Sequence, residues 1–130
     1  MLSAYLEGDS FDGRNLETLT DVNHVTRGGR DLFIMAVDAN RDPTKWNTFM
    51  AGDTTWLDKM NAEIVTVTNS DFTCTAGSSS NVGSMIDYFI LSRPLLSLIV
   101  HVHANINVPW GTHYGIDLRL HAIPQNFVYR

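Results

Sequence analysis

Three places in the sequence carry polar side chains of the kinds that activate water or hold a phosphate. Asp38 and Asn40 stand two residues apart after an apolar run, and α/β folds place functional groups at such strand ends. Asp87 interrupts the apolar segment "SMIDYFILS", where a carboxylate needs either solvent or a hydrogen-bond donor. His113 lies in "PWGTHYGIDLRL" and is suited to contact a phosphate or exchange a proton. Each also has an ordinary interpretation, as a turn residue, a helix cap or a solvated side chain.

Two further features carry weaker chemistry. His101 and His103 point to one face of an expected strand, but zinc needs three or four ligands and no third lies nearby in the sequence. We therefore interpret them as a solvated face. Cys74 is the only cysteine, so the chain has no intrachain disulfide, and we expect a small buried residue there.

Composition indicates one globular domain. The chain has 130 residues, of which 44% are hydrophobic, and its formal net charge is −5. A basic nucleic-acid clamp is disfavoured by this charge, because binding a phosphate backbone needs clustered Lys and Arg. An enzyme that holds a single phosphate through a metal is still compatible with it. With no signal peptide and no apolar run near ~20 residues, we expect a soluble intracellular protein, nuclear or cytoplasmic.

The elements that would position these residues predict an α/β fold. A strand, a helix and a buried apolar strand fill the first 37 residues, and strands predominate after a helical stretch. The expected strands are 2–6, 32–37, 63–68, 71–75, 84–92, 95–103 and 115–122, and the expected helices are 15–27 and 43–60.

The order of these elements and residues resembles the endonuclease/exonuclease/phosphatase superfamily. That superfamily includes apurinic-site endonucleases, pancreatic-type deoxyribonucleases and LINE-type retrotransposon endonucleases. The resemblance runs from about Ala4 to Leu120 and is most specific in "VGSMIDYFILSRPLL", residues 82–96. It implies an α/β sandwich, the C-terminal half of a four-layer α/β/β/α fold. Residues 1–130 would then form a single partial domain, with the N-terminal half absent.

The resemblance also implies a role for each candidate residue. Asp38 would activate the attacking water and ligate the metal, and Asn40 would orient the water and hold the phosphate. Asp87 would support the catalytic His113, which also contacts the phosphate. Tyr5 would be a further phosphate contact. The implied cofactor is Mg²⁺ or Mn²⁺.

Two departures from the family pattern weaken the implied site. Val37 stands where the family has a glycine, and Thr112 stands where it has an aspartate beside the histidine. The family's main metal-binding glutamate lies in the half that we expect to be absent. We therefore expect weak Mg²⁺ binding by this chain, because Asp38 is the only remaining anchor.

These considerations leave three functional hypotheses. The leading one is a fragment of a metal-dependent, nuclease-like phosphodiesterase, retroelement-derived and inactive alone, with DNA as the favoured partner. The second is a phosphodiesterase or phosphatase of the same fold that acts on a small phosphate ester or lipid. The third is a non-catalytic remnant or interaction module. The chain is also expected to carry essentially one sheet, whose open inner face would bind the absent half or a second copy.

Overall fold

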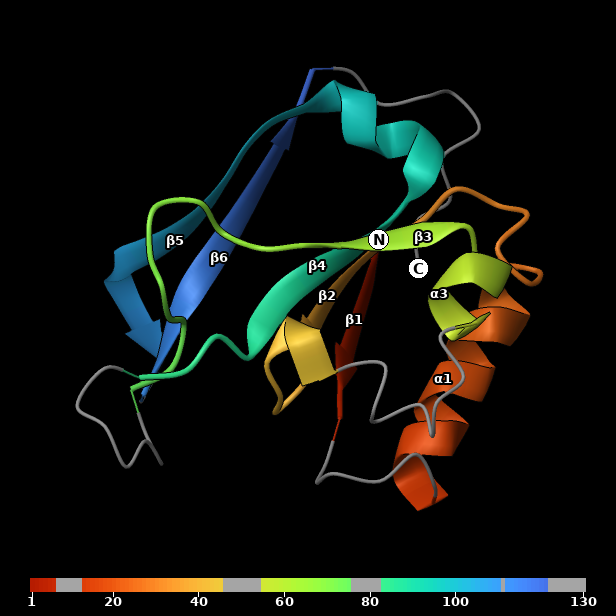
Figure 1. The fold of residues 1–130 in the computed structure, drawn as a ribbon, viewed down its shortest axis with the longest axis horizontal. Coiled ribbons are helices and arrows are strands. Elements are labelled where there is room, and N and C mark those ends of the chain that lie inside the picture. The colour runs from red at the N-terminus through yellow and green to blue at the C-terminus, as the bar shows by residue number, and fades with distance from the viewer. Residues whose placement is uncertain (7–12, 46–54, 76–82, 111, 122–130) are drawn as a thin grey trace.

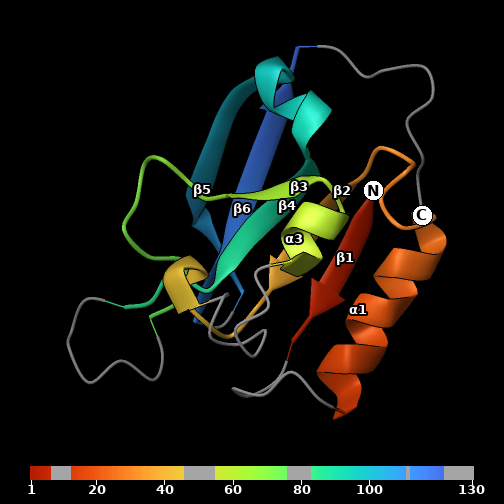
Figure 2. The ribbon, with the colours of Figure 1, turned by 45° about the vertical axis from the view of Figure 1, so that its right-hand side comes forward.

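A four-stranded sheet with helices on one face and a β-hairpin on the other forms this protein (Figures 1 and 2). The structure is a computed structural model, and it describes residues 1–6, 13–45, 55–75, 83–110 and 112–121. The elements are β1 Leu2–Tyr5, α1 Gly13–Val25, β2 Ile34–Asp38, the 3₁₀ helix η1 Pro43–Lys45, α3 Thr55–Lys59, β3 Ala62–Val65, β4 Asp87–Ser92, the 3₁₀ helix η2 Arg93–Leu98, β5 Ile99–Trp110 and β6 His113–Leu120.

The larger sheet has the strand order β1-β2-β4-β3. β1 is parallel to β2, and α1 makes the crossover between them, as parallel neighbours require. β4 runs antiparallel to both β2 and β3. This order places the carboxyl ends of β1 and β2 beside the beginning of β4, so that these three strand ends lie side by side.

The outer face of this sheet is covered by helices, as the sequence predicts. Leu19 and Val22 of α1 pack with Met35, Tyr88 and Ile90, all of which are buried. α3 adds Trp56 and Leu57 at the margin of the same cluster. After α1 the backbone is left-handed at three successive residues, Arg27 (φ 54°), Gly28 (φ 68°) and Gly29 (φ 83°), and glycine adopts this conformation without strain at the last two.

The inner face is covered by the hairpin of β5 and β6, and here our expectation was wrong. Ile34, Phe89 and Leu91 are buried against Val102 and Ala104 of β5. β6 contributes alternate apolar residues to the same cluster: Ile116, Leu118 and Leu120. The described residues therefore carry two packed sheets, because the alternation along β5 and β6 gives the hairpin an apolar face of its own.

Several strand boundaries also differ from the prediction. β4 begins at Asp87 rather than at residue 84, so that carboxylate lies at a strand end instead of mid-strand. The segment predicted to be a strand from residue 95 starts as η2, whose first turn contains a proline that favours a helical start. His113 is the first residue of β6, not a loop residue. Half of the helical stretch expected between 43 and 60 falls outside the described residues, and the described part contains η1 and α3. No helix among those described has the length and apolarity needed to cross a membrane.

Candidate active site

Three neighbouring side chains, those of Tyr5, Asp38 and Asp87, form a row across the larger sheet where β1 and β2 end. Tyr5 is paired with Asp38, and Asp38 is paired with Asp87 on its other side. Side chains of directly paired residues point to the same face of a sheet. All three therefore lie on the inner face, toward the hairpin. The sheet register alone brings the two carboxylates together.

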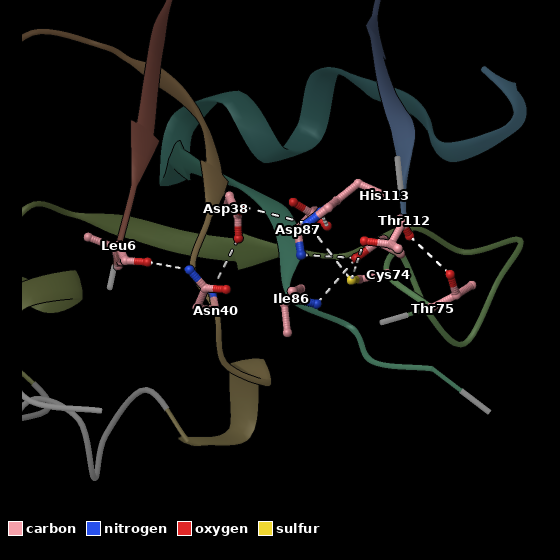
Figure 3. Close-up of polar contacts among 10 residues, drawn as sticks. Leu6, Asp38, Asn40, Cys74, Thr75, Ile86, Asp87, Thr112 and His113 are labelled. Carbon is pink, nitrogen blue, oxygen red and sulfur yellow. Dashed lines mark hydrogen bonds and ion pairs between the residues drawn. The ribbon is translucent and has the colours of Figure 1, made fainter. Parts of the chain in front are cut away.

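His113 reaches this row from the smaller sheet (Figure 3). Its Nδ1 lies 2.8 Å from Oδ2 of Asp87, and its Nε2 lies 3.9 Å from Oδ2 of Asp38. The first contact is a hydrogen bond, and an imidazole that donates from Nδ1 leaves Nε2 directed at the second carboxylate. The structure thus brings Asp38, Asp87 and His113 within contact distance, with the histidine between the two acids.

The electrostatics of Asp38 follow from this crowding. Burial raises the pKa of Asp38, and the neighbouring Asp87 carboxylate raises it further. His113 and the backbone N–H of Asn40 lower the same pKa, but their effect is smaller. A carboxyl group with a raised pKa accepts a proton more readily than an ordinary aspartate, which suits a general base.

A cavity of about 420 Å³ opens beside these residues, between the two sheets. Asp38, Asp87 and His113 line its polar end. Small and apolar residues line the rest: Ser3, Ala4, Ala36, Val37, Tyr114 and Ile116. The cavity is large enough for a phosphate ester, and its charged groups are gathered on one side.

Two of the predicted site residues are placed differently from the others. Asn40 is exposed, with φ at 53°, and its Nδ2 donates a 2.6 Å hydrogen bond to the carbonyl of Leu6. Its backbone N–H lies 3.3 Å from Oδ1 of Asp38, the geometry of an Asx turn. The amide nitrogen therefore ties the end of β1 to the turn after β2. Tyr5 lies in the row but is 57% exposed, and neither residue lines the cavity.

A short segment around Cys74 joins the two sheets beside the site, and sequence reasoning missed this. Cys74 bridges to Ser84 on one side and to His113 on the other. The Thr75 N–H donates to the carbonyl of Thr112, and the Tyr114 N–H donates to that of Thr73. Cys74 is buried, as expected, with Sγ 3.8 Å from Nε2 of His113. The segment is too short to show periodicity, so the only sequence indication was the expected short strand 71–75.

Gly83 permits this segment to approach the lead-in to β4. Its φ is +83°, and a Cβ at this position would lie 2.7 Å from the carbonyl oxygen of Cys74. No side chain fits there without moving backbone. This close contact with Cys74 explains why position 83, in the segment that resembles the family motif, is a glycine.

The other histidine pair stays apart from the site. The rings of His101 and His103 stack with centroids 4.3 Å apart, on the face of β5 opposite to Val102. In the part of the chain that the structure describes, only Asp38, Asp87 and His113 form a group of three metal-ligating side chains, with ligand atoms within 4.8 Å of one another.

This group fits a divalent cation. Two carboxylates and one imidazole offer oxygen and nitrogen ligands. Burial first, and then the Asp87 carboxylate, raise the pKa of Asp38, and a cation bound beside it would favour its ionised form. Asp87 already accepts a hydrogen bond from His113, the arrangement that orients a metal-binding histidine. Three ligands leave most positions of a Mg²⁺ ion to water, which favours weak binding.

Comparison with known proteins identifies the fold. No family model and no curated protein sequence matches the chain. Among solved structures, it is similar to the "Endonuclease domain of TRAS1, a telomere-specific non-LTR retrotransposon", with a TM-score of 0.63 and 19% sequence identity. The match covers 91% of this chain and 55% of that domain, so the chain spans about half of the neighbour's length. The chain has the α/β sandwich fold of the corresponding part of that domain.

Proposed function

We propose that this chain carries part of a metal-assisted phosphodiesterase site that cleaves nucleic acid, with Asp38, Asp87 and His113 as its chemical groups. The observation that carries the proposal is the position of His113, hydrogen-bonded to one carboxylate and facing the other at the end of a cavity. The fold shared with a retrotransposon endonuclease domain supports phosphodiester chemistry over other uses of such a cluster.

Each group has a role in this proposal that its contacts support. Asp38 accepts the proton of the attacking water, for which its raised pKa suits it. Asp87 fixes the tautomer and orientation of His113 through the 2.8 Å bond. The Nε2 of His113, which this bond turns toward Asp38 and the cavity, is the ring atom that contacts the phosphate or a bound cation. A divalent cation bound here would supply further stabilisation of the negative charge that develops on the phosphate.

Asn40 and Tyr5 belong to the proposal as supporting groups at the edge of the site. The Asn40 amide nitrogen is used by Leu6, which leaves its carbonyl oxygen as the atom able to accept a hydrogen bond from water. The register places the Tyr5 side chain on the same sheet face as Asp38, and we propose that its hydroxyl contacts the bound phosphate. Mg²⁺ or Mn²⁺ is the cofactor that we propose, and DNA is the proposed substrate.

A small phosphate ester is the second candidate substrate. The net charge of −5 favours it, because a long anionic strand is repelled by an acidic protein while a single phosphate is held by local groups. Nicking of supercoiled plasmid and hydrolysis of bis(p-nitrophenyl) phosphate separate the two candidates. Cleavage of the small diester with no plasmid nicking would favour the second.

The sharpest test restores the carboxylate that the family resemblance places beside the histidine. Thr112 is exposed, its backbone carbonyl accepts the hydrogen bond from Thr75, and its Oγ1 accepts only a long 3.7 Å contact from the Cys74 thiol, which an aspartate oxygen can also accept. Thr112→Asp should therefore fold normally while adding a third carboxylate next to His113. We expect tighter Mg²⁺ binding by calorimetry and faster plasmid nicking in Mn²⁺, both by roughly tenfold or more.

Two variants control this experiment. Thr112→Asn has nearly the same shape without the charge and should give neither gain. Asp117→Asn removes an exposed carboxylate elsewhere on β6 and should change nothing. If Thr112→Asp gains no affinity for Mg²⁺ and no activity on either substrate, the chain is better described as a non-catalytic remnant.

A further inference from the structure

We infer that Thr73 is a positioning residue, whose buried hydroxyl holds Asp87 and, through it, His113 in the geometry of the site. The inference deepens the proposed function and rests on it, because the pair that Thr73 positions is the proposed acid–histidine pair. Thr73 has no contact with the cavity and would not touch a substrate.

The side chain of Thr73 makes two hydrogen bonds to the start of β4. Its Oγ1 accepts the backbone N–H of Ile86 at 3.2 Å and that of Asp87 at 3.0 Å. Thr73 is fully buried, with 0% of its surface exposed. Water therefore does not replace the hydroxyl as acceptor for these two N–H groups, and β4 needs this oxygen to begin where it does.

The main chain of Thr73 holds the other partner. Its carbonyl accepts the backbone N–H of Tyr114 at 2.9 Å, directly after His113, and its own N–H donates to Ser84 at 2.9 Å. One residue thus fixes the backbone next to both members of the 2.8 Å Asp87–His113 pair. The two come from different sheets, so a common support is what keeps their separation constant.

If Thr73 positions Asp87 through its hydroxyl, a variant that keeps the shape of the side chain but lacks the oxygen should disturb the site. Valine has nearly the shape of threonine and would fill the same buried space, but it offers no acceptor to two buried N–H groups. Serine keeps the oxygen and loses only the methyl group. The contrast between Thr73→Val and Thr73→Ser therefore separates positioning through the oxygen from simple packing.

Thr75 offers a matched control in the same segment. Its Oγ1 lies 3.3 Å from the carbonyl of Thr112, and the side chain is exposed. Thr75→Val removes a hydroxyl at the same junction of the sheets without touching Asp87.

The experiment is ¹⁵N NMR of the histidine side chains in the full chain, with amide hydrogen exchange measured on the same samples. In the wild type we expect His113 to carry its proton on Nδ1, donated to Asp87. In Thr73→Val we expect loss of that tautomer preference and exchange of the Ile86 and Asp87 amides faster by roughly tenfold or more. Thr73→Ser and Thr75→Val should behave like the wild type.

Two results would overturn the inference: an unchanged tautomer of His113 in Thr73→Val, or a failure of Thr73→Ser to restore it. If Thr73→Val does not fold, Thr73→Cys takes its place, since the cysteine side chain has the same connectivity as serine but its larger sulfur is only a weak acceptor. Neither readout requires cleavage. A chain with the expected NMR behaviour and no activity would refute the proposed function and leave the positioning role intact.

Discussion

Replacing Asp38 by asparagine should make the folded chain more stable at neutral pH while removing the proposed base. Ligand atoms of Asp38 and Asp87 lie within 4.8 Å. At that separation two negative charges repel by about 0.9 kcal/mol in water and about 3.5 kcal/mol at an effective dielectric constant of 20. Attraction to His113, 3.9 Å away, offsets part of this repulsion. We therefore expect a net gain of about 1 kcal/mol in the free energy of unfolding.

The pH dependence of this gain has a definite sign. Burial and Asp87 raise the pKa of Asp38 in the folded state, so the folded protein holds that proton more tightly than the unfolded chain does. Ionised Asp38 consequently costs stability, and the cost grows as the pH rises from the ordinary value of about 3.9 through the raised pKa. The two stability curves should converge below about pH 4 and differ by a constant amount well above it.

Urea unfolding of both proteins from about pH 3.5 to neutrality measures this difference. Asparagine retains the Oδ1 that accepts from the Asn40 N–H, so the turn after β2 should survive the change. Asp117→Asn, on the solvent face of β6, should shift stability by no more than about 0.5 kcal/mol. An Asp38→Asn variant that is less stable than the wild type at neutral pH would refute the electrostatic reasoning.

Three other measurements test the site and the fold. A double-mutant cycle of Asp87→Asn and His113→Gln should give a coupling of about 1.5–3 kcal/mol, because the 2.8 Å bond is charge-assisted; a value near zero would mean that solvent screens it. Gly83→Ala should lower the free energy of unfolding by about 2–4 kcal/mol, because the added Cβ would lie 2.7 Å from the Cys74 carbonyl oxygen. Gly28→Ala is the control, because a Cβ there meets nothing closer than 3.5 Å, and equal losses in the two variants would contradict the steric argument. The purified chain should self-associate in light scattering through β1, because this strand stands at the edge of the larger sheet among the described strands; a stable monomer would refute this.

The parts of the fold that sequence reasoning could predict are those with a strong periodic pattern. The apolar run before Asp38 and the amphipathic segment around Leu19 and Val22 gave β2 and α1 nearly at their observed bounds. The position of Asp38 at a strand end followed from the same pattern. Pairing of Asp38 with Asp87 depends on strand order, which a single sequence does not reveal.

What could not be predicted depends on contacts between distant segments. The inner face is covered because β5 and β6 pair with each other in a separate sheet instead of joining the larger one. This arrangement buries Val102 and Ala104 against the larger sheet, a contact between segments far apart in the sequence. The Asn40 side chain bonds to a carbonyl 34 residues away. Thr73 looks like any threonine in a polar stretch, and only its burial beside β4 gives it a role.

The division of the site between two sheets has a thermodynamic consequence. Asp38 and Asp87 belong to the larger sheet and His113 to the hairpin, so a ligand that contacts both must clamp the sheets together. Binding of a ligand to the site therefore stabilises the packing of the two sheets: a ligand at 100 times its dissociation constant would add about 2.7 kcal/mol to the free energy of unfolding. Slower amide exchange along β6 would therefore report a bound phosphate even in a chain that never turns over.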